Sequence, residues 1–96
     1  MNLHNFDCYI SSTIVKRGKN CFKNGHVLDL IQKLNSKWVA EVAGHDEYDV
    51  EVQLSNTEEI VDSFCNCPYE GPYCKHEVAV FYTLQQEPKK KSDLLH

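Results

Sequence analysis

The sequence predicts a small α+β domain, in which an antiparallel β-meander of three to four strands lies between an N-terminal and a C-terminal helix. Three observations lead to this fold class. Apolar residues before Gly25 are spaced as on a helix, those after it alternate as in strands, and an apolar run follows His76. The second helix is therefore expected directly after a segment rich in cysteine.

The first helix is predicted within residues 10–25, ISSTIVKRGKNCFKNG. Serine and threonine near its start are residue types that cap helix N-termini, and the glycine at its end is the type that most often follows a helix. The positions that share one face of this helix are Ile14, Gly18, Cys21 and Phe22. Gly18 weakens the helix, because a glycine inside a helix costs about 1 kcal/mol relative to alanine.

After Gly25 the apolar residues alternate with polar ones, which is typical of strands with one buried face. The clearest case is YDVEVQL, and the links NSK and GHDE have the composition of turns, so neighbouring strands are expected to pair antiparallel. The expected strands are residues 26–34, with Leu28, Leu30 and Leu34 on one side, 37–44, 48–54 and 58–64.

The stretch CNCPYEGPYCKH, residues 65–76, contains three cysteines and a histidine, for which a disulfide, a thiol redox centre and a metal site are competing interpretations. Cys65 and Cys67 are too close in sequence for an unstrained disulfide, which would also leave His76 unexplained. A redox centre typically has C-x-x-C at a helix start, a spacing absent here. Three thiolates and one imidazole instead form a closed tetrahedral shell for one Zn²⁺ ion, with the ligands Cys65, Cys67, Cys74 and His76.

The residues between these ligands favour a chain that curls around one ion. In a regular strand Cys65 and Cys67 would point to opposite faces of the sheet. Pro68 fixes its own φ and holds Cys67 out of the α region, and Gly71–Pro72 turns the loop back. The apolar run HEVAVFYTLQQ then supplies the second helix. The fold prediction thus includes a zinc knuckle before the C-terminal helix.

C-x-C, a short loop and C-x-H before an apolar helix form the pattern of the SWIM zinc finger, which CPYEGPYCKHEVAV closely resembles. RGKNCFKNGHV and WVAEVAGHDEYDVEVQL are similar to the segments before the finger in N-terminal SWIM domains of bacterial Swi/Snf-type helicase-like ATPases. The resemblance covers roughly residues 8–87 and implies a module that binds protein or DNA. It also implies zinc ligation by Cys65, Cys67, Cys74 and His76.

Ninety-six residues allow one small domain with a thin core, and structural zinc contributes on the order of 10 kcal/mol to such a fold. We expect this zinc-binding domain at residues 1–87, with the finger proper at 64–86, and a disordered basic tail or linker at 88–96. There is no apolar run of about 18 residues and no signal segment, so we expect no membrane contact and a cytoplasmic location. Cys8 and Cys21 are expected to be partly buried free thiols.

The formal charge of −4 is divided along the chain. Residues 1–40 carry six Lys or Arg against two acids, residues 41–87 one Lys against eleven acids, and residues 88–96 three Lys against one Asp. A nucleic-acid surface would therefore come from the flanks. The residues that could form it are Lys16, Arg17, Lys19 and Lys23, together with the run Lys89–Lys91.

The second helix is apolar on two faces. The face that is expected to point at the zinc ion and the sheet holds His76, Ala79, Val80, Thr83 and Leu84. On the opposite side, Val78, Phe81 and Tyr82 are either covered by the first helix or form a partner-binding surface.

An enzyme is the least expected class, because catalytic zinc keeps an open coordination position and this ligand set is complete at four. The remaining histidines have no recognisable nucleophile or acid partner, and Glu70 and Glu77 are explained as a loop acid and a first-turn helix acid. We therefore expect a non-catalytic zinc module in a larger Swi/Snf-type ATPase, a monomer that contacts protein or another domain of its parent chain. DNA binding through the basic flanks is the alternative.

Overall fold

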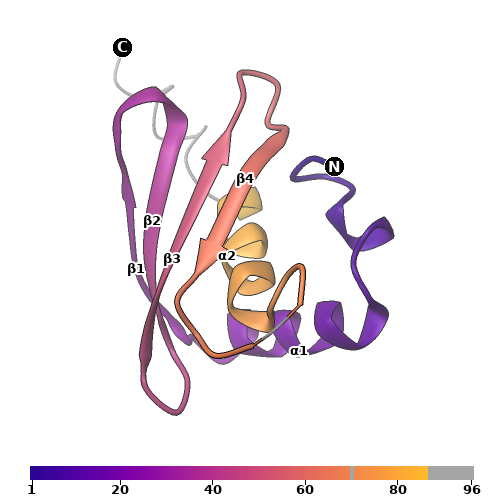
Figure 1. Ribbon diagram of the computed structural model, residues 1–96, viewed down its shortest axis with the longest axis vertical. Coiled ribbons are helices and arrows are strands. Elements are labelled where there is room, and N and C mark those ends of the chain that lie inside the picture. Colours follow the sequence, from indigo (N-terminus) through magenta and orange to yellow (C-terminus); the bar gives the residue numbers. More distant parts are fainter. Residues whose placement is uncertain (70, 87–96) are drawn as a thin grey trace.

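A computed structural model describes residues 1–69 and 71–86. The four strands form one antiparallel sheet in the order β1-β2-β3-β4, helix α2 lies against one face of this sheet, and α1 packs against α2 (Figure 1). The elements in chain order are η1 (Phe6–Cys8), α1 (Ser12–Lys23), β1 (Val27–Gln32), η2 (Leu34–Ser36), β2 (Lys37–Ala43), β3 (Glu47–Leu54), β4 (Ile60–Cys65) and α2 (Lys75–Gln86). The predicted fold class is confirmed.

The central strands β2 and β3 follow the predicted alternation. Trp38, Ala40 and Val42 of β2 are buried and pair in register with Val52, Val50 and Tyr48 of β3. The intervening residues of both strands point to the other face of the sheet, which no described helix covers. One face of the sheet thus forms the core with α2. The other, here called the open face, is covered by no helix among residues 1–69 and 71–86.

Strand β1 departs from the prediction. Leu28 and Leu34, which were expected on the buried side with Leu30, are 50% and 86% exposed. The register with β2 shifts between Val27 and Asp29, and such a bulge interrupts the alternation of side chains. Leu34 lies in the short helix η2 and outside the strand. The core therefore receives Val27 and Leu30 from this strand, both partly buried.

Helix α1 begins at Ser12 and ends before Gly25, which adopts φ 74°. Its buried face contains Ile14, Gly18 and Cys21, as the spacing predicts. At Gly18 a Cβ atom would overlap the side chain of Val78 in α2. The glycine that weakens the isolated helix therefore allows the two helices to approach closely.

The expectation of an open face at Val78, Phe81 and Tyr82 is wrong for the first two, because α1 packs on Val78 and the ring of Phe6 packs on Phe81. Val78 and Phe81 have no exposed surface, and Tyr82 is partly buried and stacks on Phe22 of α1 with ring centroids 5.9 Å apart. Coverage by the first helix, which was the other expectation for this face, holds for Val78 and Tyr82. Phe81 is packed by Phe6 and Tyr73.

The segment before α1 also contributes to the core, which the sequence analysis did not anticipate. Leu3 and Phe6 are 2% and 1% exposed. The ring of Phe6 lies with its centroid 5.2 Å from that of Phe81 and 5.0 Å from that of Tyr82. These N-terminal side chains close the end of α2 that α1 leaves open.

The two cysteines outside the knuckle differ in exposure. Both are free thiols, but Cys8 is exposed, which corrects the expectation of partial burial, and Cys21 is buried against α2. The predicted tail at 88–96 lies outside the described residues. Among the described residues, no helix has the length and apolar character needed to cross a membrane.

Candidate metal centre

The knuckle begins where β4 ends. Cys65 is the last residue of β4 and pairs with Val50, so its side chain lies on the same face of the sheet as that buried valine. The chain is then held against β3, because Asn66 donates its N–H to the Asp49 carbonyl at 3.2 Å and accepts the Asp49 N–H on Oδ1 at 2.9 Å. This pairing ends the strand and positions the turn that carries Cys67.

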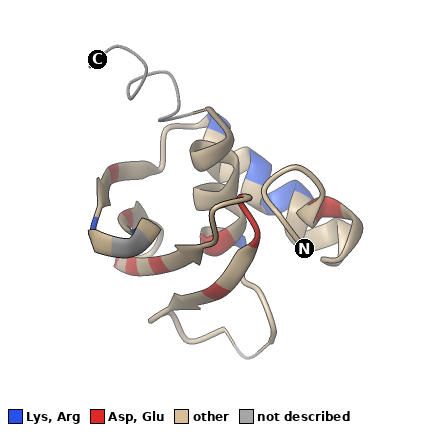
Figure 2. Cartoon of the chain, turned by 90° about the horizontal axis from the view of Figure 1, so that it is seen from above, with Lys and Arg blue, Asp and Glu red and all other residues tan. Residues whose placement is uncertain are grey.

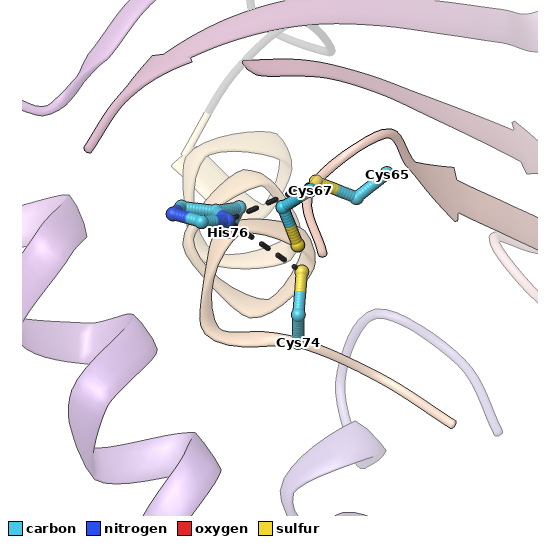
Figure 3. A group of neighbouring side chains, drawn as sticks. All are labelled: Cys65, Cys67, Cys74 and His76. Atoms are coloured by element: carbon cyan, nitrogen blue, oxygen red, sulfur yellow. Dashed lines mark hydrogen bonds between the residues drawn. The ribbon is translucent and has the colours of Figure 1, made fainter. Parts of the chain in front are cut away.

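The start of helix α2 supplies the other two candidate metal ligands. Cys74 immediately precedes the helix and is buried, and His76 lies in the first turn and is 6% exposed. Figure 3 shows that the side chains of Cys65, Cys67, Cys74 and His76 converge. Their ligand atoms all lie within 4.8 Å of one another.

The spacing of these atoms suits a tetrahedral ion. His76 Nδ1 is 3.7 Å from Cys65 Sγ and 3.7 Å from Cys74 Sγ. A tetrahedral zinc ion with Zn–S near ~2.3 Å and Zn–N near ~2.0 Å places sulfur and nitrogen ligands roughly 3.5 Å apart. The four predicted ligands are therefore brought together at a separation compatible with one zinc ion.

The orientation of His76 supports Nδ1 as the ligand atom. Nε2 points away from the thiols, is buried, and has no hydrogen-bond partner among the described residues (Figure 3). It is packed against Gly44, where an added Cβ would lie 3.1 Å from Nε2 and 3.0 Å from the Tyr48 ring. The Tyr48 ring centroid is 4.7 Å from that of the imidazole. The β2–β3 turn thus fixes the ring plane through close packing.

The pKa values of the Cys67 and Cys74 thiols are raised by their surroundings. A hydrogen bond with Cys65, followed by burial, raises the pKa of Cys74 well above its usual range. Burial likewise raises the pKa of Cys67. Protonated thiols are poor nucleophiles, so this environment does not favour thiol chemistry. A divalent cation supplies the positive charge that three neighbouring thiolates need.

Glu77 contributes to the site in a way that the sequence analysis missed. Its side chain is 5% exposed, Oε1 accepts the Cys74 N–H at 2.9 Å, and Oε2 accepts the Ser63 hydroxyl at 2.5 Å. The bond to Cys74 is one of the two hydrogen bonds of a capping box. In it, the side chain of the third helical residue accepts the backbone N–H of the N-cap residue. The bond to Ser63 joins α2 to β4. The signal available in the sequence was the spacing of three positions between Cys74 and Glu77, which is that of a capping box.

Among the described residues, the remaining histidines belong to no further group of side chains that could hold a metal ion. His4 Nε2 is 2.7 Å from the Glu58 carboxylate at the exposed N-terminal segment. His26 and His45, with Lys75 and Cys21, line an open hollow of about 310 Å³. His45 also lines a second hollow of about 280 Å³, next to Cys67 and His76 of the knuckle. Glu70 and His96 lie outside the described residues.

The predicted nucleic-acid residues share one surface. Lys16, Arg17, Lys19 and Lys23 are all exposed on α1. None of the four forms an ion pair within the part of the chain that the structure describes. Figure 2 shows these cations on the helical side, and acidic residues across the strands. The predicted run Lys89–Lys91 lies outside the described residues.

Fold and ligand set together define a small zinc-binding module, in which two ligands come from the end of a sheet and two from the start of a helix. The family model of the SWIM zinc finger matches residues 48–85, which include nearly all of β3, all of β4, the knuckle and nearly all of α2. Residues 1–47 lie outside this match. No curated protein and no solved structure matches the chain.

Proposed function

We propose that this domain is a non-catalytic interaction module whose fold is held by one zinc ion. The observation that carries the proposal is the complete set of four protein ligands at the junction of β4 and α2. A structural zinc site is closed in this way, whereas a catalytic one leaves a position for water or substrate. Bound there, zinc supplies the fixed positive charge that joins the two elements.

The test of this proposal is whether a fourth position is open to small ligands. We would load the domain with Co²⁺, whose visible absorption reports tetrahedral coordination, and add azide or thiocyanate. A closed site predicts an unchanged spectrum. A new band that titrates with the added anion would show an open position and overturn the non-catalytic assignment.

Protein or intramolecular contact is the function that the surface supports best. The face of α2 that we expected to dock a partner is covered by α1 and by Phe6, so Val78 and Phe81 cannot serve in the folded domain. The open face of the sheet takes their place, because it carries exposed apolar side chains such as Phe64, which is 56% exposed. The resemblance to N-terminal domains of Swi/Snf-type ATPases makes a neighbouring domain of a longer chain one such partner.

A cytoplasmic location forms part of this proposal. None of the five cysteines is in a disulfide, which is the usual state in reducing compartments.

DNA binding is the second candidate, and the exposed cations of α1 favour it. Helix α1 presents four positive charges, on Lys16, Arg17, Lys19 and Lys23. None of them is paired with an acid in the described part of the chain. Fluorescence anisotropy with short duplex and single-stranded DNA at two salt concentrations would test it. Sub-micromolar binding, with a salt slope that falls as these residues are changed to glutamine, would favour DNA over protein.

A further inference from the structure

The open face of the sheet carries two neighbouring rows of side chains. The first, here called the acidic row, consists of Asp29 in β1, Glu41 in β2 and Asp49 in β3, which are aligned by the strand register. The second, here called the apolar row, contains Ile31, Val39 and Phe64, and Glu51 lies between the last two. The two rows are adjacent, because their members are two residues apart along each strand.

The acidic row carries an unfavourable charge arrangement. Residues directly opposite each other in antiparallel strands have Cβ atoms about 5 Å apart, and like charges there destabilise the pair. The Glu47 carboxyl, through a hydrogen bond and its charge, raises the pKa of Glu41, and Asp49 and Asp29 add to this. Within the four described strands Lys37 is the one cationic residue, and its ammonium pairs with Glu51 at 3.1 Å. The acidic row therefore has no cation of its own.

The apolar row shows that this face is more than a solvated acidic surface. Ile31 and Phe64 are 48% and 56% exposed and lie at opposite ends of the row, on the two edge strands. Val39 is partly exposed between them. A protein-binding surface combines apolar contacts with charges, and this face offers both side by side.

We propose that this face docks a cationic segment of a protein, with Lys or Arg side chains on the acidic row and apolar side chains on the apolar row. Charge complementarity selects this partner, since the same carboxylates repel the phosphates of nucleic acid. The acids are spread across three strands, so they match successive side chains of a polypeptide and not one metal ion. The inference rests on the proposed interaction role and names the chemistry of its partner.

The experiment uses the zinc-loaded, ¹⁵N-labelled chain and a synthetic peptide in which pairs of arginines alternate with pairs of leucines as the probe. When such a peptide is extended, each of its faces carries arginine and leucine in turn. A peptide with glutamate in place of arginine is the control probe. We expect the arginine peptide to shift amide resonances of β1, β2 and β3 and to bind less tightly as salt is added. Shifts confined to α1 or α2, or equal binding of the glutamate peptide, would overturn the proposal.

Matched variants locate the contact. The double variant Glu41→Gln/Asp49→Asn should raise the Kd for the arginine peptide about tenfold or more, and Phe64→Ala at least about threefold. Asp7→Asn and Tyr9→Ala remove one exposed acid and one exposed aromatic residue outside the sheet, and should leave the Kd within about twofold. Equal losses in the sheet variants and in these controls would reject the face as the site.

Failure of this inference is distinguishable from failure of the proposed function. If the arginine peptide does not bind, while the cobalt-loaded site stays closed to azide, the docking inference falls and the structural zinc assignment stands. An open cobalt site would reject the assignment whatever the peptide does.

Discussion

Ser63 of β4 donates its hydroxyl to Oε2 of Glu77 in α2 at 2.5 Å, and this bond joins the two elements that supply the metal ligands. The other carboxylate oxygen of Glu77 accepts the N–H of Cys74. One buried side chain thus positions a ligand residue and fixes the start of α2 against the strand that ends in Cys65. The geometry of the site depends on this carboxylate as well as on the ligands.

Replacing Glu77 by alanine should weaken both the fold and the site. The change leaves the Cys74 N–H and the Ser63 hydroxyl without their acceptor, which costs about 1–3 kcal/mol in unfolding free energy. Loss of a residue that orients a ligand should lower zinc affinity roughly 10–100-fold, measured by competition with a chelator of known affinity.

Glu77→Gln is the matched variant, because glutamine can accept from Cys74 and donate to Ser63. It should restore most of the zinc affinity and the visible spectrum of the cobalt-loaded site. If alanine and glutamine lowered the affinity equally, the hydrogen-bonding role of Glu77 would be wrong. A Ser63→Ala/Glu77→Ala double-mutant cycle measures the coupling between the two residues.

Zinc removal should unfold at least the last third of the chain. Elemental analysis should find one equivalent of zinc in the folded protein, and complete chelation should remove most of the helical circular dichroism. Acid should also release the metal, since protons compete for the thiolates and for His76. Less than half an equivalent of zinc in a folded sample, or an unchanged spectrum after chelation, would contradict this prediction.

Cysteine variants separate the ligands from the free thiols. Cys74→Ser should lose the metal, whereas Cys8→Ser and Cys21→Ser should keep it, as measured by zinc content after dialysis. Retention of a full equivalent by Cys74→Ser would remove that residue from the ligand set.

Gly18→Ala should destabilise the domain although alanine favours helices. The added methyl group would overlap Val78, and overpacking of this kind costs about 1–3 kcal/mol. Thermal unfolding should then occur several degrees lower, by about 4–8 °C per kcal/mol in a domain of this size. Asn20→Ala, at an exposed position of the same helix, is the control and should be neutral or slightly stabilising. A Gly18→Ala variant as stable as this control would show that the helices are not in close contact.

Glu41→Gln should stabilise the domain at neutral pH. The pKa of Glu41 is raised in the folded state above its ordinary 4.5, so the folded state binds the proton more strongly than the unfolded state. The contribution of Glu41 to the free energy of unfolding is therefore greatest at low pH, and it is lost as the pH rises through the raised pKa of Glu41. Urea unfolding should give a variant that is more stable than the parent at pH 7 and equal to it near pH 3. A parent more stable than the variant at pH 7 would mean that Glu41 is favourably paired.

The sequence was sufficient to predict the order of the main helices and strands and the convergence of four cysteine and histidine side chains. Both predictions rest on residues that are close together in the sequence. These are the alternation in YDVEVQL, which indicates a strand, and the C-x-C and C-x-H spacings, which indicate a metal site. The site residues Cys65, Cys67, Cys74 and His76 converge as their spacing requires.

Features that depend on distant contacts could not be read from the sequence. Nothing near Leu28 marks the bulge that exposes it, because the bulge is a property of the pairing with β2. The burial of Phe6 requires α2, which lies at the other end of the described chain. For the same reason Gly18 was interpreted as a weak point of one helix, although its role is in the contact between two.

The N-terminal segment has a consequence for the order of folding. The backbone carbonyl of Leu3 accepts a hydrogen bond from the Gln85 side chain at 2.5 Å, so the N-terminal segment and the end of α2 meet although 82 positions separate the two residues. The metal ligands, by contrast, are at most eleven positions apart. Closing the short metal loop costs little chain entropy and closing the long one costs more, which favours early assembly of the knuckle and late docking of Leu3 and Phe6. During synthesis these two apolar side chains remain without their partners until α2 has been made.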